Sequence, residues 1–358
     1  MNRYRVALVP GDGIGQEVVP AGTLVCEAAA ERFGFQLDWQ SFPWGSDHYF
    51  QHGTMMPEDG LEQLRRFDAI YLGAVGHPRI QDNVTLNGLL LPIRRGFYQY
   101  ACVRPAVLYP GVTSPLVGKK PGEIDLVVVR ENTEGEYAQV GGHVHAGTPA
   151  EVAVQTAVFT RHGTERVIRY AFELAQRRGK RRRVTSVTKS NAQGFGMVFW
   201  DRVFAEVARE FPDTATESLL VDAACMELVR RPESFDVIVA SNLFGDILTD
   251  LSAIVTGSLG LAPSANLNPA RSHPSMFEPV HGSAPDIAGW GIANPLATIL
   301  AGSMMLEFLG EAEAARAVEA CVGGVLSAGA PLTPDLGGQA GTRDVALAVA
   351  AAVKHAPA

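Results

Sequence analysis

The chain has 358 residues, of which 47% are hydrophobic and 19% charged, a composition typical of a folded globular protein. Its length is too great for one ordinary core and suggests about two domains. The formal net charge of −8 argues against general nucleic-acid binding. No apolar run approaches the roughly 20 residues that a membrane-spanning helix needs, and the sequence opens on a strand pattern, not on that of a signal peptide.

Neither the cysteines nor a basic run of the sequence favours a binding site. The four cysteines lie far apart and form no CxxC pair, so we interpret them as reduced thiols and not as a zinc site or a disulfide framework: Cys26, Cys102, Cys225 and Cys321. The run RRGKRRRV at residues 177–184 could bind phosphate, but no aromatic residue interleaves it, which favours a solvated helix end and turn. We therefore expect a cytoplasmic enzyme-like protein.

The first predicted elements are a strand at residues 6–10, the turn GDGIG and a helix that extends to about Phe33. The three glycines of the turn are similar to a dinucleotide-binding loop. However, Gln16 stands where the GxGxxG fingerprint needs its third glycine, and no clear acidic residue follows a second strand. The pattern therefore favours a plain strand-to-helix turn over a Rossmann fingerprint.

A second buried strand at residues 69–76 leads into an apolar stretch that carries Arg94, Arg95 and Arg104. A guanidinium group binds a carboxylate through two parallel hydrogen bonds, so arginines near the mouth of an α/β site suggest an anionic substrate. Taken singly, each arginine is more typical of the protein surface.

Charged residues recur where predicted strands end. Arg130 closes the strand DLVVVR, Lys189 follows VTSVT, Asp222 follows SLLV, and Asp246 follows DVIVA by a few residues. Open α/β sheets bind their ligands at the carboxyl ends of their strands. Four such residues, with the charges that a metal and a carboxylate need, favour a catalytic site.

Asp246 and Asp250 lie in the segment FDVIVASNLFGDILTDL, in which a buried strand gives way to an amphipathic helix. Residues four apart lie on one helix face, and two like charges held together need a cation between them. A divalent metal is one interpretation. The other is a pair of helix-start acids that the helix dipole stabilises.

The segment FEPVHGSAPDIAGWGIANP at residues 277–295 is too rich in glycine and proline to form a helix or a strand. Long ordered loops in compact domains are usually functional. The exposed amides of its glycines could bind phosphate, and Asp286 could accept hydrogen bonds from ribose hydroxyls, although a packed Ω-loop is the alternative. The remaining sequence predicts helices at residues 297–309, 311–328 and 344–354.

Six motifs together resemble the metal-dependent β-decarboxylating dehydrogenases, the family of the isopropylmalate, isocitrate, tartrate and D-malate dehydrogenases. In chain order they are PGDGIGQE, IRRGFYQYxxxRP, VRENTEGEY, TKSN, SNLFGDILTDL and EPVHGSAPDIAGWGIANP. The resemblance covers essentially the whole chain. It implies a two-domain α/β fold like that of isopropylmalate dehydrogenase and not a Rossmann fold. The first, cofactor-side domain would combine residues 1–99 with 260–358, and the dimerisation, metal and substrate domain would span 100–259.

The resemblance also implies a homodimer with shared active sites, NAD as cofactor, and Mg²⁺ or Mn²⁺. Tyr137 matches the residue that protonates the enolate carbon, and Lys189 the residue that assists loss of the hydroxyl proton, with Lys189 and Asp222 supplied by the partner. The remaining positions carried over are Arg94, Arg104 and Arg130 for the substrate carboxylates, Asp222, Asp246 and Asp250 for the metal, and His281, Gly282, Ser283, Ala284, Asp286 and Asn294 for the cofactor.

The motifs are most similar to those of the tartrate and D-malate branch, whose substrates are small dicarboxylic 2-hydroxy acids. TLNGLLLPIRR lacks the serine and asparagine of the isocitrate enzymes, and Asn87 stands where isopropylmalate enzymes tend to have an acid. Leu90 and Leu91 could face an isopropyl group but are more typical of a core, so isopropylmalate dehydrogenase is the second candidate. Cys102 departs from the asparagine expected near the nicotinamide. A non-catalytic regulatory subunit is a further alternative, which the retained Tyr137 argues against.

Overall fold

The computed structural model describes residues 1–357, and the chain divides into two compact units. Unit 1 contains residues 1–99, 104–124 and those from 252 onward, whereas unit 2 contains residues 100–103 and 125–251. The first unit is discontinuous, since it takes elements from both ends of the chain. Residues 104–124 and 252–259, which the predicted boundaries assign to the second domain, lie in unit 1.

The sheet of unit 1 has the strand order β2-β1-β3-β12-β11. Strands β1, β2, β3 and β12 run parallel, and β11 pairs antiparallel with β12. Every residue of β3 is buried, as expected of a central parallel strand with an uninterrupted apolar sequence. The strands are β1 (Arg3–Gly11), β2 (Gln36–Ser41), β3 (Ala69–Ala74), β11 (Pro263–Leu267) and β12 (Ser275–Pro279), while β4 (Ala101–Val107) has residues in both units.

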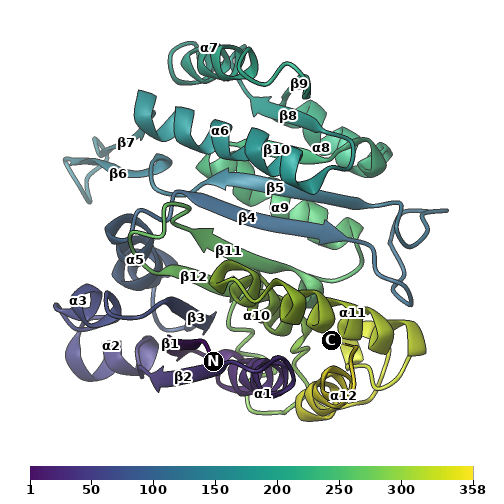
Figure 1. Ribbon diagram of the computed structural model, residues 1–358. Helices are drawn as coiled ribbons and strands as arrows, with labels where there is room; N and C mark the ends of the chain where they lie inside the picture. The colour runs from purple at the N-terminus through teal and green to yellow at the C-terminus, as the bar shows by residue number, and fades with distance from the viewer. Residues whose placement is uncertain (358) are drawn as a thin grey trace. The chain divides into compact units, whose positions relative to one another are not determined.

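Four long helices pack together in unit 1 (Figure 1). Their buried faces meet through side chains such as Val25, Ile299, Val322 and Val349. These helices are α1 (Gly15–Phe33), α10 (Leu296–Leu309), α11 (Ala312–Ala328) and α12 (Thr342–Lys354). The shorter elements are α2 (Ser46–His52), α3 (Gly60–Leu64), α4 (Asp82–Thr85), the π-helical turn η1 (Leu86–Leu90), α5 (Leu91–Gly96), and the 3-10 turns η3 (Leu259–Leu261) and η4 (Pro334–Leu336).

Unit 2 contains four parallel strands in the order β5-β10-β8-β9. A separate antiparallel ribbon, β6 paired with β7, is exposed along most of its length. The strands are β5 (Asp125–Glu131), β6 (Gly135–Val144), β7 (Val152–Val158), β8 (Arg183–Thr188), β9 (Ala215–Leu220) and β10 (Val237–Ala240). The helices are α6 (Arg161–Arg178), α7 (Gly196–Ala208), α8 (Val221–Arg230), the 3-10 turn η2 (Pro232–Ser234) and α9 (Asn242–Val255).

The structure confirms most of the predicted elements. The strand expected at residues 6–10 lies within β1, the following helix ends at Phe33, and the three carboxyl-terminal helices are α10, α11 and α12. The strand expected at residues 69–76 ends two residues earlier, at Ala74. Within residues 1–357, no helix is both long enough and apolar enough to cross a membrane.

The basic run at residues 177–184 is a helix end and turn, as predicted, but its arginines are not all solvated. Helix α6 ends at Arg178, and Gly179 follows with a φ of 62°, the left-handed conformation common after helices. Arg178 Nε donates to Asp236 Oδ1 at 2.9 Å, and the Arg181 amide donates to Asp236 Oδ2 at 3.1 Å. Because the Asp236 side chain is fully buried, part of the run neutralises an internal carboxylate.

Candidate active site

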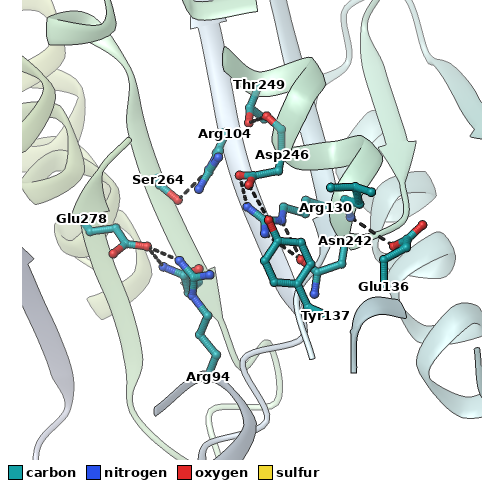
Figure 2. Close-up of polar contacts among 12 residues, drawn as sticks. Arg94, Arg104, Arg130, Glu136, Tyr137, Asn242, Asp246, Thr249, Ser264 and Glu278 are labelled. Atoms are coloured by element: carbon teal, nitrogen blue, oxygen red, sulfur yellow. Dashed lines mark hydrogen bonds and ion pairs between the residues drawn. The ribbon is translucent and has the colours of Figure 1, made fainter. Parts of the chain in front are cut away.

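Helix α9 starts directly after the buried strand β10, where the sequence SNLFGD changes the backbone from strand to helix. Glu136 on β6 satisfies this helix start. Its Oε1 accepts a hydrogen bond from the Ser241 hydroxyl at 2.8 Å, and its Oε2 accepts one from the Leu243 amide at 3.1 Å. The first amides of a helix lack partners within the helix, so this carboxylate caps α9 and fixes the residues that follow (Figure 2).

Arg130 lies at the carboxyl end of β5 and is only 2% exposed. Its Nε and Nη2 donate to Asn242 Oδ1 at 2.9 and 2.7 Å, and its Nη1 forms an ion pair with Asp246. The ring of Tyr137 lies 5.1 Å from the guanidinium carbon, within the range of a cation–π contact. Gly245 permits this packing, because a Cβ at that position would lie 2.6 Å from Arg130 Cβ.

Asp246 joins two of the predicted functional residues within unit 2. One carboxylate oxygen pairs with Arg130, and the other accepts a hydrogen bond from the Tyr137 hydroxyl at 2.9 Å (Figure 2). The Asp246 side chain nevertheless remains 33% exposed. The arrangement therefore presents an oriented carboxylate that a ligand can still reach.

The helix-dipole interpretation of the two acids is contradicted by the structure. The first turn of α9 contains no acidic residue, so Asp246 and Asp250 both lie beyond the region where the dipole acts strongly. The two residues are one helical turn apart, and Asp250 is exposed. The helix start therefore does not explain the position of these two acids.

The carboxylates of Asp246 and Asp250 are possible oxygen ligands for a metal ion. Within residues 1–357 of a single chain, no three histidine, cysteine, aspartate or glutamate side chains cluster closely enough to hold a metal. Asp246 and Asp250 supply two carboxylates, which suit Mg²⁺ or Mn²⁺ and not zinc. The two carboxylates fit part of an oxygen-ligand site, and further ligands would have to come from outside this pair.

Lys189 and Asp222 lie together elsewhere in unit 2, after β8 and at the start of α8. Lys189 Nζ is 2.8 Å from Asp222 Oδ1. This hydrogen bond, and then the lysine charge, lower the pKa of Asp222 below the ordinary value of an aspartate. Because the Asp222 side chain is 60% exposed, the pair contributes little to folding. It does keep the carboxylate ionised and accessible.

Two further predicted arginines lie in unit 1. Arg94 on α5 is buried, and its Nη2 donates to Glu278 Oε1 at 2.7 Å, an oxygen that also accepts from Asn266 Nδ2 at 2.7 Å. Its Nε is buried without a hydrogen-bond partner among residues 1–357. Arg104 on β4 is also buried, and its Nε donates to Ser264 Oγ at 3.2 Å (Figure 2).

The predicted cofactor loop of unit 1 rests on the GDGIG turn. The Ile14 amide donates to the Ser283 carbonyl at 2.9 Å. Gly13 has a φ of +53°, and a Cβ there would lie 2.0 Å from the same carbonyl oxygen, so only glycine allows the contact. Ala284 adopts a left-handed φ of 40°, which is uncommon for alanine. Asp286 and Gly282 are exposed on this loop.

The two ends of the loop are fixed differently. Burial lowers the pKa of His281 below its ordinary value, and its Nε2 is buried without a partner among residues 1–357. Asn294 is buried, accepts from the Leu296 amide at 3.0 Å and donates to Asp335 Oδ2 at 2.9 Å. Asn294 therefore satisfies the first amide of α10, whose N-cap residue is Pro295.

Residues 5–349 match the family described as isocitrate/isopropylmalate dehydrogenase. The chain belongs to that family. It is 54% identical, over 99% of its length and 97% of the relative's, to a probable tartrate dehydrogenase/decarboxylase of Agrobacterium vitis, and 53% identical, over 98% of both, to a decarboxylating D-malate dehydrogenase of Escherichia coli. Among solved structures, an isocitrate dehydrogenase of Methylococcus capsulatus matches 98% of this chain and 99% of its own, at 38% identity and a TM-score of 0.88.

These comparisons confirm the family that the motifs indicated, and with it the two-domain α/β fold class. They also agree with the expectation of a decarboxylating dehydrogenase of the tartrate and D-malate type, since the relatives at 53–54% identity carry those names. Dehydrogenases of the isocitrate/isopropylmalate family generally use NAD or NADP together with a divalent metal.

The segment that separates branches of the family contains an irregular helix. Asn87 lies in the π-helical turn η1 and is partly exposed. Turns of this kind are frequent at functional sites. Leu90 and Leu91 are buried at 8% and 3% exposure, which confirms the interpretation of these leucines as core residues. Cys102 is fully buried.

Sequence reasoning did not single out several residues that position the site. Glu278 holds Arg94, Asn242 holds Arg130, Glu136 caps α9, and Asp335 holds Asn294. Glu278, Asn242 and Glu136 lie inside the recognised motifs, but motif spacing does not reveal which arginine or amide each one contacts. Asp335 lies outside these motifs, so no motif indicates its contact with Asn294.

Proposed function

We propose that this protein catalyses the NAD-dependent and divalent-metal-dependent oxidation of D-malate or tartrate, with β-decarboxylation where the 2-hydroxy acid has a carboxylate on C3. The observation that carries the proposal is the linked set Arg130, Asp246 and Tyr137 in unit 2. It combines a cation for a substrate carboxylate, a carboxylate for a metal and a hydroxyl that can transfer a proton. The names of the relatives support the same substrates.

The reaction explains why these residue types are needed. A carboxylate on C3 leaves as CO₂ only if the electrons left on C3 can be delocalised, so oxidation at C2 to the ketone has to come first. When bound, a divalent ion held by Asp246 and Asp250, with Asp222 of a second copy, would act as a Lewis acid on the C2 oxygen, while NAD accepts the hydride.

The protein's own residues then supply binding and proton transfer. Arg94, Arg104 and Arg130 would hold the two carboxylates through charge-assisted hydrogen bonds. Lys189 would accept the proton of the C2 hydroxyl, and the Tyr137 hydroxyl would protonate C3 after CO₂ has left. In the structure that hydroxyl donates to Asp246, so its proton is already directed towards the carboxylate of the metal site.

Substrate size favours malate and tartrate over isopropylmalate. An isopropyl group needs apolar side chains that face the ligand, yet Leu90 and Leu91 are buried in the protein. Asn87 offers an amide where isopropylmalate enzymes tend to have an acid. A small dicarboxylic acid with a polar C3 substituent requires no such apolar surface. Isopropylmalate oxidation remains the second candidate to test.

We further propose a homodimer whose two chains complete each other's sites. Exposed apolar side chains lie on α8, α9 and the β6–β7 ribbon, among them Met226, Val229, Ile247, Val140 and Val152. An apolar surface of this kind commonly marks a protein interface. Asp246 and Asp250 also lack a third carboxylate within the described residues of their own chain, which a partner's Asp222 would supply.

NAD is the proposed cofactor, not NADP. Asp286 lies exposed on the loop proposed to contact the adenosine. The other residues proposed to contact the cofactor there are His281, Gly282, Ser283, Ala284 and Asn294. A carboxylate there accepts hydrogen bonds from a free ribose 2′-hydroxyl and repels a 2′-phosphate. The cysteines form no disulfide in the described residues, which supports a cytoplasmic location.

The test is NADH formation by purified protein with D-malate, the tartrate isomers and isopropylmalate, each with Mn²⁺ or Mg²⁺. The expected result is turnover of D-malate or tartrate that EDTA abolishes and added metal restores. Activity that survives thorough metal removal would overturn the mechanism. Higher catalytic efficiency with NADP would overturn the cofactor assignment, and no turnover of any acid would favour a regulatory subunit.

A further inference from the structure

A group of arginines outside the proposed active site lies in unit 1, around a cavity of about 320 Å³. The cavity is lined by residues at or just before the starts of β1, β3 and β12 and by the end of α10. These three strands are parallel, so their starts share one edge of the sheet. The GDGIG turn and the proposed cofactor loop follow the opposite, carboxyl ends. The cavity is therefore distinct from the proposed active-site residues.

The charge of this lining is opposite to that of the whole protein. Four arginines line the cavity, against Asp68 as the one carboxylate among the lining residues: Arg5, Arg65, Arg66 and Arg271. Asp68 Oδ2 already accepts from the Arg5 backbone amide at 2.7 Å. In a chain with a net charge of −8, such a concentration of cations is a local exception. It creates a positive potential that attracts anions.

Most of these guanidinium charges are not balanced by protein carboxylates. Among residues 1–357, Arg5, Arg66 and Arg271 have no carboxylate within ion-pair distance. Arg65 is the exception, because its Nε pairs with Glu62 at 3.1 Å. Arg5 has no ion-pair partner, but its charge helps to lower the pKa of Asp38, after the larger effect of Arg3. Cations without ion-pair partners around one small cavity repel one another unless an anion binds between them.

Aromatic contacts nevertheless hold the arginines in place. The guanidinium carbon of Arg66 lies 5.5 Å from the centre of the Phe67 ring, and that of Arg271 lies 4.7 Å from the Phe308 ring. Stacking on a ring orients the planar guanidinium and leaves its N–H groups free to donate at the edges. The cations are therefore partly ordered before a ligand binds.

The backbone of Arg271 is also constrained. Its φ of 54° is in the left-handed region, which an arginine rarely adopts. The buried Asn268 stabilises this turn, because its carbonyl accepts from the Arg271 amide at 2.9 Å and its Nδ2 donates to the Phe97 carbonyl at 2.8 Å. Residues in sparsely populated conformations often lie at ligand sites. Here the turn directs residues 271–273 to the cavity.

We propose that this cavity binds the polyphosphate group of a small molecule. A guanidinium group matches the geometry of phosphate oxygens, and several unbalanced cations favour a ligand with several negative charges. The volume of about 320 Å³ is at the lower end of the roughly 300–1,000 Å³ typical of ligand pockets. It suits a pyrophosphate group, and the nucleoside of a nucleotide would extend beyond the opening.

The test is calorimetric titration of the full-length protein with pyrophosphate, with NADH in excess to occupy the cofactor's own phosphate positions. One site per chain is expected. Its affinity should fall as salt is raised from about 50 to about 200 mM, because at about 0.1 M salt ionic interactions are screened beyond a Debye length of about 10 Å. Replacing Arg66 and Arg271 by Gln should weaken binding about tenfold for each lost charge-assisted contact. Arg66→Gln alone tests the site if the double variant does not fold.

The matched control is the double variant Arg316→Gln with Arg343→Gln, two exposed arginines on α11 and α12 that give the same change in charge. Unchanged binding in this control supports the proposal, and an equal loss would show nonspecific attraction and overturn it. Absence of binding in the wild type, or unchanged binding in the Arg66 and Arg271 variants, would also overturn it.

Two further ligands identify the source of the phosphate group. Tighter binding of ATP than of pyrophosphate supports a nucleotide, and tighter binding of pyrophosphate supports an inorganic ligand. Citrate has several negative charges but no phosphate. If citrate binds as tightly as pyrophosphate, the assignment to phosphate is overturned.

Discussion

The Tyr137 hydroxyl donates to Asp246 Oδ2 at 2.9 Å, while Arg130 pairs with the other oxygen of the same carboxylate. The proposed proton donor and the proposed metal ligand are thus connected directly within unit 2. A change to either residue alters the surroundings of the other. A substitution that tests one of these residues should therefore leave its contact with its neighbours in place. At position 246 the new side chain should still accept a hydrogen bond from Tyr137, and at position 137 it should keep the aromatic ring.

Asp246→Asn should lower metal-dependent turnover by at least about 100-fold. The loss of a residue that only orients a metal ligand usually costs about 10- to 100-fold, and the loss of a direct ligand should cost more. The substitution removes a charge but retains an oxygen that can accept from Tyr137. Arg130 also keeps both of its hydrogen bonds to Asn242, so the fold should survive. The measurement is kcat/KM as a function of Mn²⁺ concentration, with circular dichroism to verify folding.

The exposed Asp213→Asn, also in unit 2, is a control with the same change in charge. It should retain wild-type turnover. If Asp246→Asn is as active as this control, Asp246 is not a metal ligand.

Tyr137→Phe should lower kcat by roughly 10²–10⁴-fold, the usual range for the loss of a general acid. The ring remains to pack against Arg130, and Asp246 keeps its ion pair, so the dependence on metal concentration should change little. Steady-state kinetics over substrate and Mn²⁺ concentration separates these effects. A variant with normal kcat but weak metal binding would assign Tyr137 to the organisation of the metal site alone.

Local sequence patterns predicted the strands and the main helices because each pattern depends on nearby residues. The apolar run of β3 and the helical spacing of α10 need no distant partner to be recognised. The pairing of Arg94 with Glu278 could not be predicted in this way, because 184 positions separate them. The i, i+4 spacing of Asp246 and Asp250 likewise fixed their shared face, but not their distance from the first turn of the helix.

Glu278→Gln should destabilise the protein by about 3 kcal/mol, at the low end of the cost of breaking a buried ion pair, because the amide oxygen can still accept from Arg94. Both side chains are almost fully buried, at 4% and 7% exposure, so Arg94 would keep an uncompensated charge. Urea unfolding measures the difference. Glu62→Gln, which affects the exposed pair with Arg65, should cost no more than about 1 kcal/mol. Equal losses for the two variants would contradict this account of the Arg94 site.

The stability of the protein should depend on His281 below neutral pH. Burial lowers the pKa of this histidine from 6.5, so the unfolded chain takes up the proton before the folded chain does. The contribution of neutral His281 is present above pH 6.5 and is lost as the pH falls from 6.5 towards the lower pKa of the folded state. His281→Gln should therefore flatten the decline of the unfolding free energy in this window. The control is His145→Gln, a substitution in an exposed turn, which should leave the decline unchanged. If the unfolding free energy falls equally steeply with pH in the wild type and in His281→Gln, the prediction is wrong.

The single chain does not contain the whole of the proposed metal site, because Asp222 contacts Lys189 and does not join Asp246 and Asp250 in a three-acid cluster within residues 1–357. The motifs predict which residues belong to the proposed site. They could not specify its geometry, which under the proposal depends on two chains related by symmetry.

Mixing two inactive variants should restore activity if the sites are shared. Lys189→Ala and Asp246→Asn should each be inactive as homodimers. In a mixed dimer, one site would receive both substitutions and the other would receive neither, because Lys189 and Asp246 of one site come from different chains. Random exchange of subunits should therefore restore about a quarter of wild-type activity, since half of the dimers are mixed and each has one intact site.

Lys189→Ala mixed with Asp222→Asn is the matched control. Both residues would come from the same chain, so each site of that mixed dimer would keep one substitution and activity should stay low. Equal recovery in the two mixtures, or none in either after verified exchange, would contradict the shared site.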